Sequence, residues 1–334
     1  MTKALEKAAR AIEAAQHIVL AGHINPDGDT LGCVLALAHA LRELGKDVLA
    51  LSQDGVPEIY RWMPGADWIE QASDRRDFDL AIVCDAGAIH RVGYAITPVI
   101  ESAPVLIDVD HHVADGTFGD FRLVDSHASA TAELVWKLIG KLSRIYGKTL
   151  ATRAVADCLM TGIITDTGSF RFMNVTPSTF LLAARLQRLG AVPSRIAELV
   201  FEDRSYASLK LLGRALDSLQ LIANGRVAWA HVTTQDFEEL DATDEDTEGI
   251  VNHVRAVHSA QVGILFREIP GRRVRVSLRA RDGADVNRIA SAFGGGGHRL
   301  AAGCSMDPPL ALVESAILAE ACRELQQPEC GPAA

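Results

Sequence analysis

Residues 17–45 read HIVLAGHINPDGDTLGCVLALAHALRELG, and this stretch decides the fold class. It begins with a short apolar run, His17–Ala21, which is typical of a buried strand. A helical pattern follows a polar loop, and Gly45 supplies its stop signal. The apolar residues of that pattern recur at helical spacing: Leu31, Val34, Leu35, Ala38, Leu41 and Leu44. A strand followed by a short loop and a helix predicts the first unit of an α/β sheet.

Three more strands extend this pattern through the first part of the chain. Val48–Leu51 predicts the next strand, and Leu80–Cys84 and Val105–Val109 are the near-continuous apolar runs that parallel sheets bury on both faces. Helices are predicted over Met1–Gln16, Thr131–Leu142 and Thr152–Ile164. We therefore expect an α/β fold with a doubly wound, mainly parallel sheet in a domain covering residues 1–192.

The hydrophobic pattern changes after this domain. Residues 193–216 mix leucines with Arg and Glu, which predicts a helical linker. Residues 217–330 predict a smaller α/β (α+β) domain, with a helix over Val286–Phe293. Its predicted strands are Val227–Val232, Val262–Arg267 and Val274–Leu278. In residues 236–248, eight of thirteen residues are acidic, which predicts a solvated loop or helix face.

Composition excludes several classes of protein. The chain has 334 residues, of which 48% are apolar and 23% charged, so it is long enough for two cores and is not a disordered chain. A net charge of −10 argues against a long nucleic-acid footprint, because proteins that track phosphates carry a basic face. The richest apolar stretch, Leu31–Leu41, is shorter than the roughly 20 residues of a membrane-spanning helix.

Two further features of the sequence bear on the compartment. The N-terminus is amphipathic and lacks an apolar signal core. The six cysteines include no C-x-x-C pair, and four of them lie in apolar surroundings, which predicts small buried thiols in a reducing compartment. We therefore expect a cytoplasmic protein with no membrane partner.

Acidic and histidine side chains follow the predicted strands at the points where the strands end. They are His23, Asp27 and Asp29 after the first strand, Asp85 after Leu80–Cys84, Asp110, His111 and His112 after Val105–Val109, and Asp166 after a helix. Because the carboxyl ends of parallel strands meet at one crevice, we expect these side chains to converge there. Carboxylates placed so close together repel one another unless cations neutralise them.

The types of these ligands restrict the metal. Carboxylates and imidazoles without a thiolate disfavour a structural zinc site and suit Mn²⁺, Mg²⁺ or Co²⁺. At least four Asp and two His exceed what one ion needs, so two ions that share a carboxylate are expected. Such a pair activates a water and holds both oxygens of a phosphoryl displacement. The sequence therefore predicts a hydrolase of phosphoesters or phosphoanhydrides.

These residues resemble the four motifs of the DHH phosphoesterase superfamily, named after its Asp-His-His triplet. The motifs are His23-Ile-Asn-Pro-Asp27-Gly-Asp29, Asp85, Asp110-His111-His112 and Asp166. Gly294-Gly-Gly-Gly297-His298 is similar to the glycine-rich signature of the DHH-associated domain, which family II inorganic pyrophosphatases lack. The likeness covers nearly the whole chain. Length and architecture are most similar to the bacterial nanoRNase branch, which joins oligoribonuclease with phosphatase activity on 3′-phosphoadenosine-5′-phosphate (pAp).

The resemblance implies two manganese ions per site, with Mg²⁺ or Co²⁺ as alternatives. It assigns His23 and Asp27 to the first ion, Asp29, His111 and Asp166 to the second, and Asp85 to both. It implies that His112 acts as a general acid or bonds the phosphate, and that Asp110 orients the histidines. The implied substrates are RNA of about two to five nucleotides and pAp, with no long duplex partner.

The glycine run has a physical explanation of its own. Four consecutive glycines permit a positive φ and close backbone approach, so their amides can face an anion. An Arg at the end of a strand can grip phosphate oxygens bidentately. Together with the resemblance, this predicts substrate binding by Arg279, Gly295, Gly296, Gly297 and His298. Arg91 and Arg171 lie near the motifs, but the sequence does not decide their roles.

Three rival functions stay open at this level. A RecJ-like exonuclease on long single-stranded DNA is weakened by the acidic charge, the short chain and the lack of an added OB-fold. A cyclic-dinucleotide phosphodiesterase shares both domains and is separable only by assay. A non-catalytic binding module would not need all six ligands. The preferred substrate, the exonuclease polarity, the physiological metal and the oligomeric state, including a homodimer, are also left open.

Overall fold

The computed structural model describes residues 2–112, 118–271, 273–281 and 283–326. The chain divides into two compact units, Met1–Asp203 and Arg204–Ala334. The division falls inside the segment 193–216, which the sequence predicts as a linker. This segment holds α7 (Pro193–Ala197), a π-helical stretch (Glu198–Glu202) and α8 (Tyr206–Asp217). The predicted domain end at residue 330 lies outside the described residues.

The first unit is built on a six-stranded parallel sheet in the order β3-β2-β1-β4-β5-β6. Its strands are β1 (His17–Ala21), β2 (Asp47–Leu51), β3 (Ile69–Glu70), β4 (Leu80–Cys84), β5 (Leu106–Asp110) and β6 (Phe121–Val124). The chain order reverses between β1 and β4, and open α/β sheets bind ligands at such a switch point. The predicted doubly wound parallel fold is confirmed.

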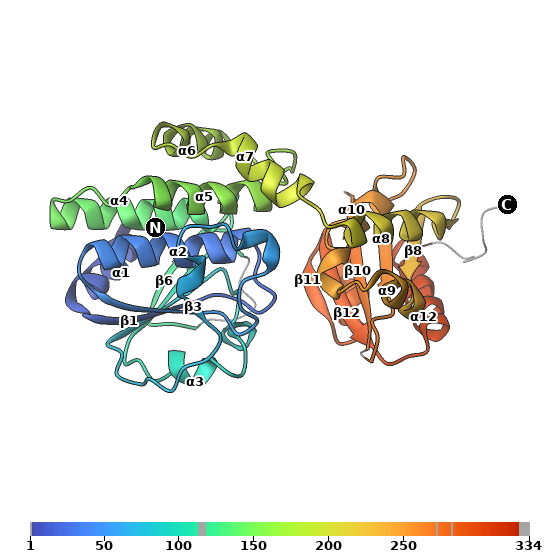
Figure 1. The fold of residues 1–334 in the computed structure, drawn as a ribbon, viewed down its shortest axis with the longest axis horizontal. Coiled ribbons are helices and arrows are strands. Elements are labelled where there is room, and N and C mark those ends of the chain that lie inside the picture. Colours follow the sequence, from blue (N-terminus) through green and yellow to red (C-terminus); the bar gives the residue numbers. More distant parts are fainter. Residues whose placement is uncertain (1, 113–117, 272, 282, 327–334) are drawn as a thin grey trace. The chain divides into compact units, whose positions relative to one another are not determined.

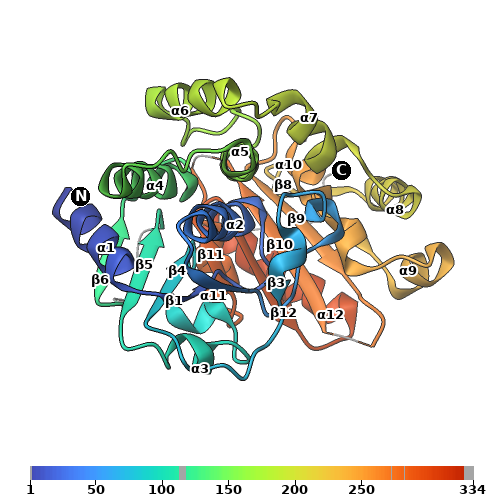
Figure 2. The ribbon, with the colours of Figure 1, turned by 60° about the vertical axis from the view of Figure 1, so that its left-hand side comes forward.

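Helices cover both faces of this sheet (Figure 1). Those on one face are α1 (Thr2–Ala14), α2 (Gly28–Glu43), α4 (Ala132–Tyr146) and α5 (Arg153–Asp166), and α3 (Thr97–Ile100) covers the other. Helix α6 (Pro177–Arg188) packs outside α5 (Figure 2). Because both faces are covered, every residue of β4 is buried, which explains its continuous apolar run.

Helices α2 and α5 approach each other closely through glycines. A Cβ on Gly32 of α2 would lie 2.4 Å from the carbonyl oxygen of Cys158 on α5. A Cβ on Gly162 of α5 would lie 2.4 Å from Oδ1 of Asp29 on α2. The absence of these side chains therefore permits the contact. It brings the start of α2, with Asp29, against the helix that ends in Asp166.

The second unit has a mixed six-stranded sheet in the order β11-β12-β10-β9-β8-β7, in which only β8 and β9 of the described strands pair in parallel. The strands are β7 (Gln220–Ile222), β8 (Val227–Val232), β9 (Val262–Arg267), β10 (Val274–Ala280), β11 (Gly296–His298) and β12 (Ala301–Met306). The helices are α9 (Thr234–Leu240), α10 (Ile250–Arg255), α11 (Val286–Ser291) and α12 (Leu310–Glu324). The predicted smaller α/β domain is confirmed.

The acidic segment 236–248 is largely solvated, as the sequence predicts, but Asp244 is partly buried. It forms part of α9 and a 3₁₀ turn (Asp244–Thr247). The carboxylate of Asp244 accepts from Arg267 on β9 at 2.8 Å and also from Arg275 on β10. At least one of the acidic residues therefore anchors the segment to the sheet, because two guanidinium groups compensate its charge.

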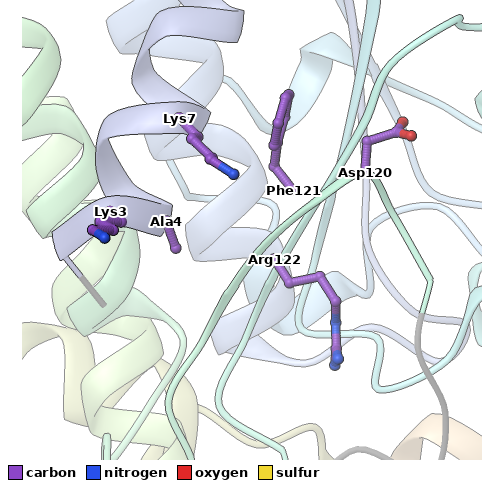
Figure 3. Close-up of a pocket in the computed structure, with 6 residues that line it drawn as sticks. All are labelled: Lys3, Ala4, Lys7, Asp120, Phe121 and Arg122. Carbon is purple, nitrogen blue, oxygen red and sulfur yellow. The ribbon is translucent and has the colours of Figure 1, made fainter.

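A hollow of about 220 Å³ lies between α1 and β6 (Figure 3). It is lined by Lys3, Ala4, Lys7, Asp120, Phe121 and Arg122. Strand β6 begins at Phe121, so the hollow lies at the amino end of the strand, opposite the edge where the predicted ligands lie. Arg122 already pairs with the buried carboxylate of Asp108, at 3.2 Å. The hollow contains none of the predicted site residues.

The structure also gives the lengths of the helices and the state of five cysteines, of which Cys322 is disulfide-bonded. In the described ranges, no helix is both long enough and apolar enough to cross a membrane. Cys33, Cys84, Cys158 and Cys304 are free thiols, and all four are buried. These four cysteines therefore contribute to the cores as small apolar side chains.

Candidate metal centre

The predicted ligands converge at the carboxyl edge of the parallel sheet. They come from the loops after β1 and β4, from β5 and the residues after it, and from the end of α5. Among the described residues, ligand atoms lie within 4.8 Å of one another in three groups. The groups are His23, Asp27 and Asp85; Asp29, His111 and Asp166; and Asp85, His111 and His112. The first two contain the residues that the family resemblance assigns to the two ions.

Backbone contacts orient the first group. The Nδ1–H of His23 donates to the carbonyl of Ile24 at 2.8 Å, so Nε2 faces the carboxylates. Nε2 lies 3.7 Å from Oδ2 of Asp85 and 3.9 Å from Oδ2 of Asp27. Asp27 caps helix α2, where its Oδ1 accepts the amides of Asp29 and Thr30 at 3.0 Å. A histidine held in this way presents its unprotonated nitrogen as a metal ligand.

The second group is oriented by the same kind of contact. The Nδ1–H of His111 donates to the carbonyl of Ala128 at 3.2 Å, and its Nε2 lies 3.1 Å from Oδ2 of Asp166. Asp29 lies at the N-terminus of α4, where its two oxygens accept the amides of Thr131 and Ala132 at 2.6 and 3.0 Å. The partial positive charge of that helix end stabilises the carboxylate.

Asp85 lies between these two groups. Its side chain is 2% exposed, and its φ of 61° is uncommon for a residue other than glycine. Oδ1 lies 3.6 Å from Nε2 of His111, and Oδ2 lies 3.7 Å from Nε2 of His23. The hydroxyls of Thr131 and Thr30 donate to Oδ1 and Oδ2, each at 2.9 Å. Each oxygen of this carboxylate therefore faces a different group.

His112 is held differently from the other two histidines. Its Nδ1–H donates to Oδ1 of Asp110 at 2.6 Å, so this nitrogen is not available as a ligand although it lies 3.4 Å from Asp85. Asp110 also accepts the amides of Gly87 at 2.6 Å and of His112 at 2.8 Å. The family resemblance implies that Asp110 orients both histidines, but His111 bonds a carbonyl instead. The two imidazole rings nevertheless pack edge to face, with centroids 4.7 Å apart.

The buried carboxylates raise one another's pKa. Burial raises the pKa of Asp29 well above its usual value, and the charges of Asp85 and Asp166 raise it further. Burial also raises the pKa of Asp85. Burial alone would lower the pKa of His111, but its hydrogen bond to Asp166 and the nearby carboxylates raise it. The cluster therefore favours positive charge at its centre.

The donor set fits divalent cations. Within the described residues, the three groups contain only carboxylate oxygens and imidazole nitrogens. The Sγ of Cys33 lies 3.5 Å from Oδ1 of Asp29, but burial raises the pKa of this thiol, so it stays protonated. Oxygen and nitrogen ligands without thiolate suit Mn²⁺, Mg²⁺ or Co²⁺. Cations at this place would neutralise the carboxylates that burial otherwise destabilises.

Arg91, whose role the sequence leaves undecided, lies beside His112. A Cβ on Gly87 would lie 3.5 Å from Nη1 of Arg91, and 3.9 Å from both Cβ of His112 and Oδ2 of Asp110. The carbonyl of Arg91 accepts the amide of Ile24 at 2.7 Å, which ties this turn to the loop after β1. A guanidinium at this place can bond a phosphate oxygen.

The predicted substrate-binding residues of the second unit lie on three adjacent strands. Arg279 on β10 and His298 on β11 both stand opposite Ala301 of β12. Arg279 is half-buried, and its Nη1 donates to the carbonyl of Leu278 at 3.1 Å. The register therefore brings the strand positions of Arg279 and His298 into one row across the sheet.

The glycine run is packed tightly against β12. A Cβ on Gly295 would lie 2.2 Å from the carbonyl oxygen of Gly303, and one on Gly297 would lie 2.5 Å from that of Ala301. The amides of Gly294 and Gly295 donate to carbonyls of α11, at 3.1 and 3.0 Å. These two amides close the end of the helix. Gly294, Gly296 and Gly297 are exposed, and Gly295 is half-buried.

Comparisons with known proteins decide the family. The model of the DHH family, N-terminal domain, matches residues 17–163, and the model of the DHHA1 domain matches residues 224–326. A protein of Thermus thermophilus named bifunctional oligoribonuclease and PAP phosphatase NrnA is 31% identical over 291 residues, which cover 86% of this chain and 84% of that protein. The chain belongs to the DHH family. A Bacillus subtilis protein of the same name is 28% identical to this DHH protein over 300 residues, 89% of this chain and 91% of the relative.

Solved structures show the same fold. An exopolyphosphatase-related protein from Bacteroides fragilis has a TM-score of 0.89 at 24% identity, over 97% of this chain and 96% of that one. RecJ of Thermus thermophilus in complex with Mn²⁺ has a TM-score of 0.60 at 15% identity, over 98% of this chain and 55% of that one. At these identities the likeness concerns the fold of this DHH protein and not its substrate.

Proposed function

We propose that this DHH protein is a two-metal phosphoesterase that hydrolyses short oligoribonucleotides to mononucleotides and pAp to AMP. The observation that carries the proposal is the position of Asp85, whose two oxygens face the Nε2 atoms of His23 and His111 at 3.7 and 3.6 Å. Two groups of ligands that share one carboxylate suit a pair of cations. The names of relatives at 26–31% identity support the choice of substrates.

Manganese is the proposed cofactor, with Mg²⁺ or Co²⁺ as substitutes. When bound, divalent cations lower the pKa of a water and neutralise charge on the phosphate. His23 and Asp27 would hold one of them, and Asp29, His111 and Asp166 would hold the other. Asp85 would be shared between the two. The donor set and the Mn²⁺ in the structure of the similar RecJ support this assignment.

The protein's own residues supply proton transfer and positioning. The bond from Nδ1 of His112 to Asp110 orients the ring, and Nε2 would give a proton to the leaving oxygen. Asp110 acts through this bond as a positioning residue, as the carboxylate of a catalytic dyad does. In the second unit, Arg279 and the exposed Gly296 and Gly297 would hold a phosphate of the short substrate, together with Gly295 and His298.

We further propose that the protein works in the cytoplasm and does not take long nucleic acid. Four of the five described cysteines are free and buried, which supports a reducing compartment, and the disulfide-bonded Cys322 is the exception. The net charge of −10 disfavours long polyanions, since each bound phosphate needs a compensating cation. Light scattering of the purified chain will decide between a monomer and a homodimer.

One parallel assay tests the proposal. The purified chain is given pAp, a 5′-phosphorylated diribonucleotide, cyclic di-AMP and a long single strand of DNA, each with Mn²⁺, Mg²⁺, Co²⁺ or a chelator. We expect hydrolysis of the first two substrates, fastest with Mn²⁺ and absent with the chelator. Preferred turnover of cyclic di-AMP or of the long strand would replace the proposed substrates. Turnover that persists with the chelator would overturn the two-metal proposal.

A further inference from the structure

An exposed aromatic ring follows the proposed metal ligand Asp166. Phe172 lies in the loop between α5 and α6, and it is 43% exposed. A Cβ added to Gly168 would lie 2.4 Å from Cζ and 2.5 Å from Cε1 of Phe172. The outer part of the Phe172 ring therefore occupies the space that a side chain at position 168 would need. Gly168 itself is buried under the ring. The ring therefore rests on backbone two residues after Asp166 and leaves a large part of its surface to solvent.

The loop that carries this ring is held by many contacts. The carbonyl of Thr167 accepts the amides of Arg171 at 2.9 Å and of Phe172 at 3.0 Å. The Oγ1 of Thr167 accepts the amide of Phe170 at 3.0 Å. Asn174 donates to the carbonyl of Asp166 at 3.1 Å and to a carbonyl of the loop before α4 at 2.9 Å. The ring thus has a fixed place relative to Asp166, and a ligand that stacks on it would pay little ordering entropy.

Further exposed apolar side chains follow Phe172 in the chain. Met173 is 82% exposed, and Phe180 and Leu181 on α6 are 56% and 64% exposed. The ring of Phe180 stacks on Phe170 with centroids 5.4 Å apart. The exposed Phe172 and Met173 are adjacent in the chain and are available to a ligand, whereas one face of the Phe180 ring is already covered by Phe170.

Charge indicates which ligand this surface takes. In a chain with a net charge of −10, residues 167–175 contain no Asp or Glu and include one cation, Arg171. The Nε of Arg171 donates to the carbonyl of Gly168, so the cation is held within the loop. An apolar ring next to a cation and beside a phosphate-binding centre fits a nucleotide, whose base is flat and whose phosphate is anionic.

We propose that the ring of Phe172 is a stacking surface for the nucleobase of the nucleotide whose phosphate binds at the metal centre. The inference rests on the proposed function and adds a determinant of specificity to it. Stacking on an aromatic ring tolerates every base, because every base has a π face. Phe172 would therefore select nucleotides over other phosphoesters without selecting a sequence.

The test compares substrates with and without a base. The manganese-loaded wild type, Phe172→Ala and Phe172→Trp are each given pAp and ribose 3,5-bisphosphate, which lacks the base. We expect Phe172→Ala to lose about five- to a hundredfold in kcat/KM on pAp and less than about twofold on the base-free compound. Phe172→Trp should keep the activity on pAp, because it keeps an aromatic ring. The matched control is Phe180→Ala, which removes a comparably exposed ring that packs on Phe170.

A second readout does not depend on turnover. The fluorescence of the Phe172→Trp protein is titrated with AMP and with ribose 5-phosphate, and we expect quenching by AMP alone. Three results would each overturn the stacking surface. They are an equal kcat/KM of wild type and Phe172→Ala on pAp, no quenching by AMP, and equal losses of kcat/KM in Phe172→Ala and Phe180→Ala. If the wild type hydrolyses neither bisphosphate, the proposed function fails, and the fluorescence titration still decides whether the ring binds a base.

Discussion

Asp85→Asn is the substitution with the largest expected effect. It keeps the size of the side chain and removes a charge that faces His111 at 3.6 Å and His23 at 3.7 Å. At about 4 Å and an effective dielectric constant of about 20, one pair of unit charges is worth about 4 kcal/mol. That energy corresponds to about a thousandfold in the affinity for each cation. We therefore expect loss of metal and a fall in kcat of several orders of magnitude.

The same substitution should increase the free energy of unfolding of the metal-free protein. Burial raises the pKa of Asp85, and a raised carboxyl pKa means that stability is lost as pH rises from the unfolded pKa through the folded one. At neutral pH the neutral Asn avoids this loss, and the hydroxyls of Thr30 and Thr131 can rotate to accept or donate. The metal-free variant should therefore melt at a higher temperature than the metal-free wild type.

Calorimetric titration with Mn²⁺, melting curves and kcat on pAp make up the assay. Asp108→Asn is the matched control, because Asp108 is equally buried on β5 of the same sheet but pairs with Arg122. The control should bind manganese as the wild type does. Two manganese ions bound at unchanged affinity in Asp85→Asn, together with full activity, would refute the shared carboxylate.

Three further predictions concern other parts of the molecule. His112→Ala should bind manganese normally in calorimetry and lose about 10²–10⁴ in kcat, and loss of metal would show that the roles of His111 and His112 are exchanged. Arg279→Ala should lower kcat/KM for a 5′-phosphorylated dinucleotide by about 1.5–3 kcal/mol, with almost no effect on a minimal chromogenic phosphodiester; equal losses on both would place Arg279 in the chemistry or the fold. The hydrogen bond to Glu314 raises the pKa of His231. This pair therefore contributes less than about 1 kcal/mol to the free energy of unfolding, and the contribution is complete below the pKa of His231 in the unfolded chain and is lost as pH rises through its pKa in the folded protein. The melting temperatures of wild type and Glu314→Gln should therefore differ at pH near 6 and converge at alkaline pH, and a constant difference would exclude this linkage.

Continuous apolar runs made the central strands predictable. The predicted bounds of β1 and β4 agree with the structure, and β2 and β5 differ by one residue. The edge strand β6 was missed because Arg122 interrupts a strand of only four residues. Strand β11 was missed because two of its three residues are glycines, which do not favour strands, and pairing with β12 overrides that preference.

The ligand cluster was predictable for a different reason. Its residues are placed by strand ends and a helix end, so the topology alone brings them together. The directions of loop side chains are set by contacts distant in sequence. Arg91 turns toward His112 and Phe172 rests on Gly168, and no local pattern encodes either contact. The same applies to the carbonyl of Ala128, which orients His111 from 17 residues away.

The close contact of α2 with α5 has a consequence for engineering. Gly32 and Gly162 lie inside helices, where glycine costs about 1 kcal/mol relative to alanine. A programme that seeks heat resistance would replace them first, since exchanging Gly for Ala in a helix is a common route to greater stability. Here the added methyl group at Gly162 would collide with the carboxylate of Asp29, and the one at Gly32 with the backbone of α5. Thermostable variants of this enzyme should be sought elsewhere in the chain, because its helix glycines set the spacing of the ligands.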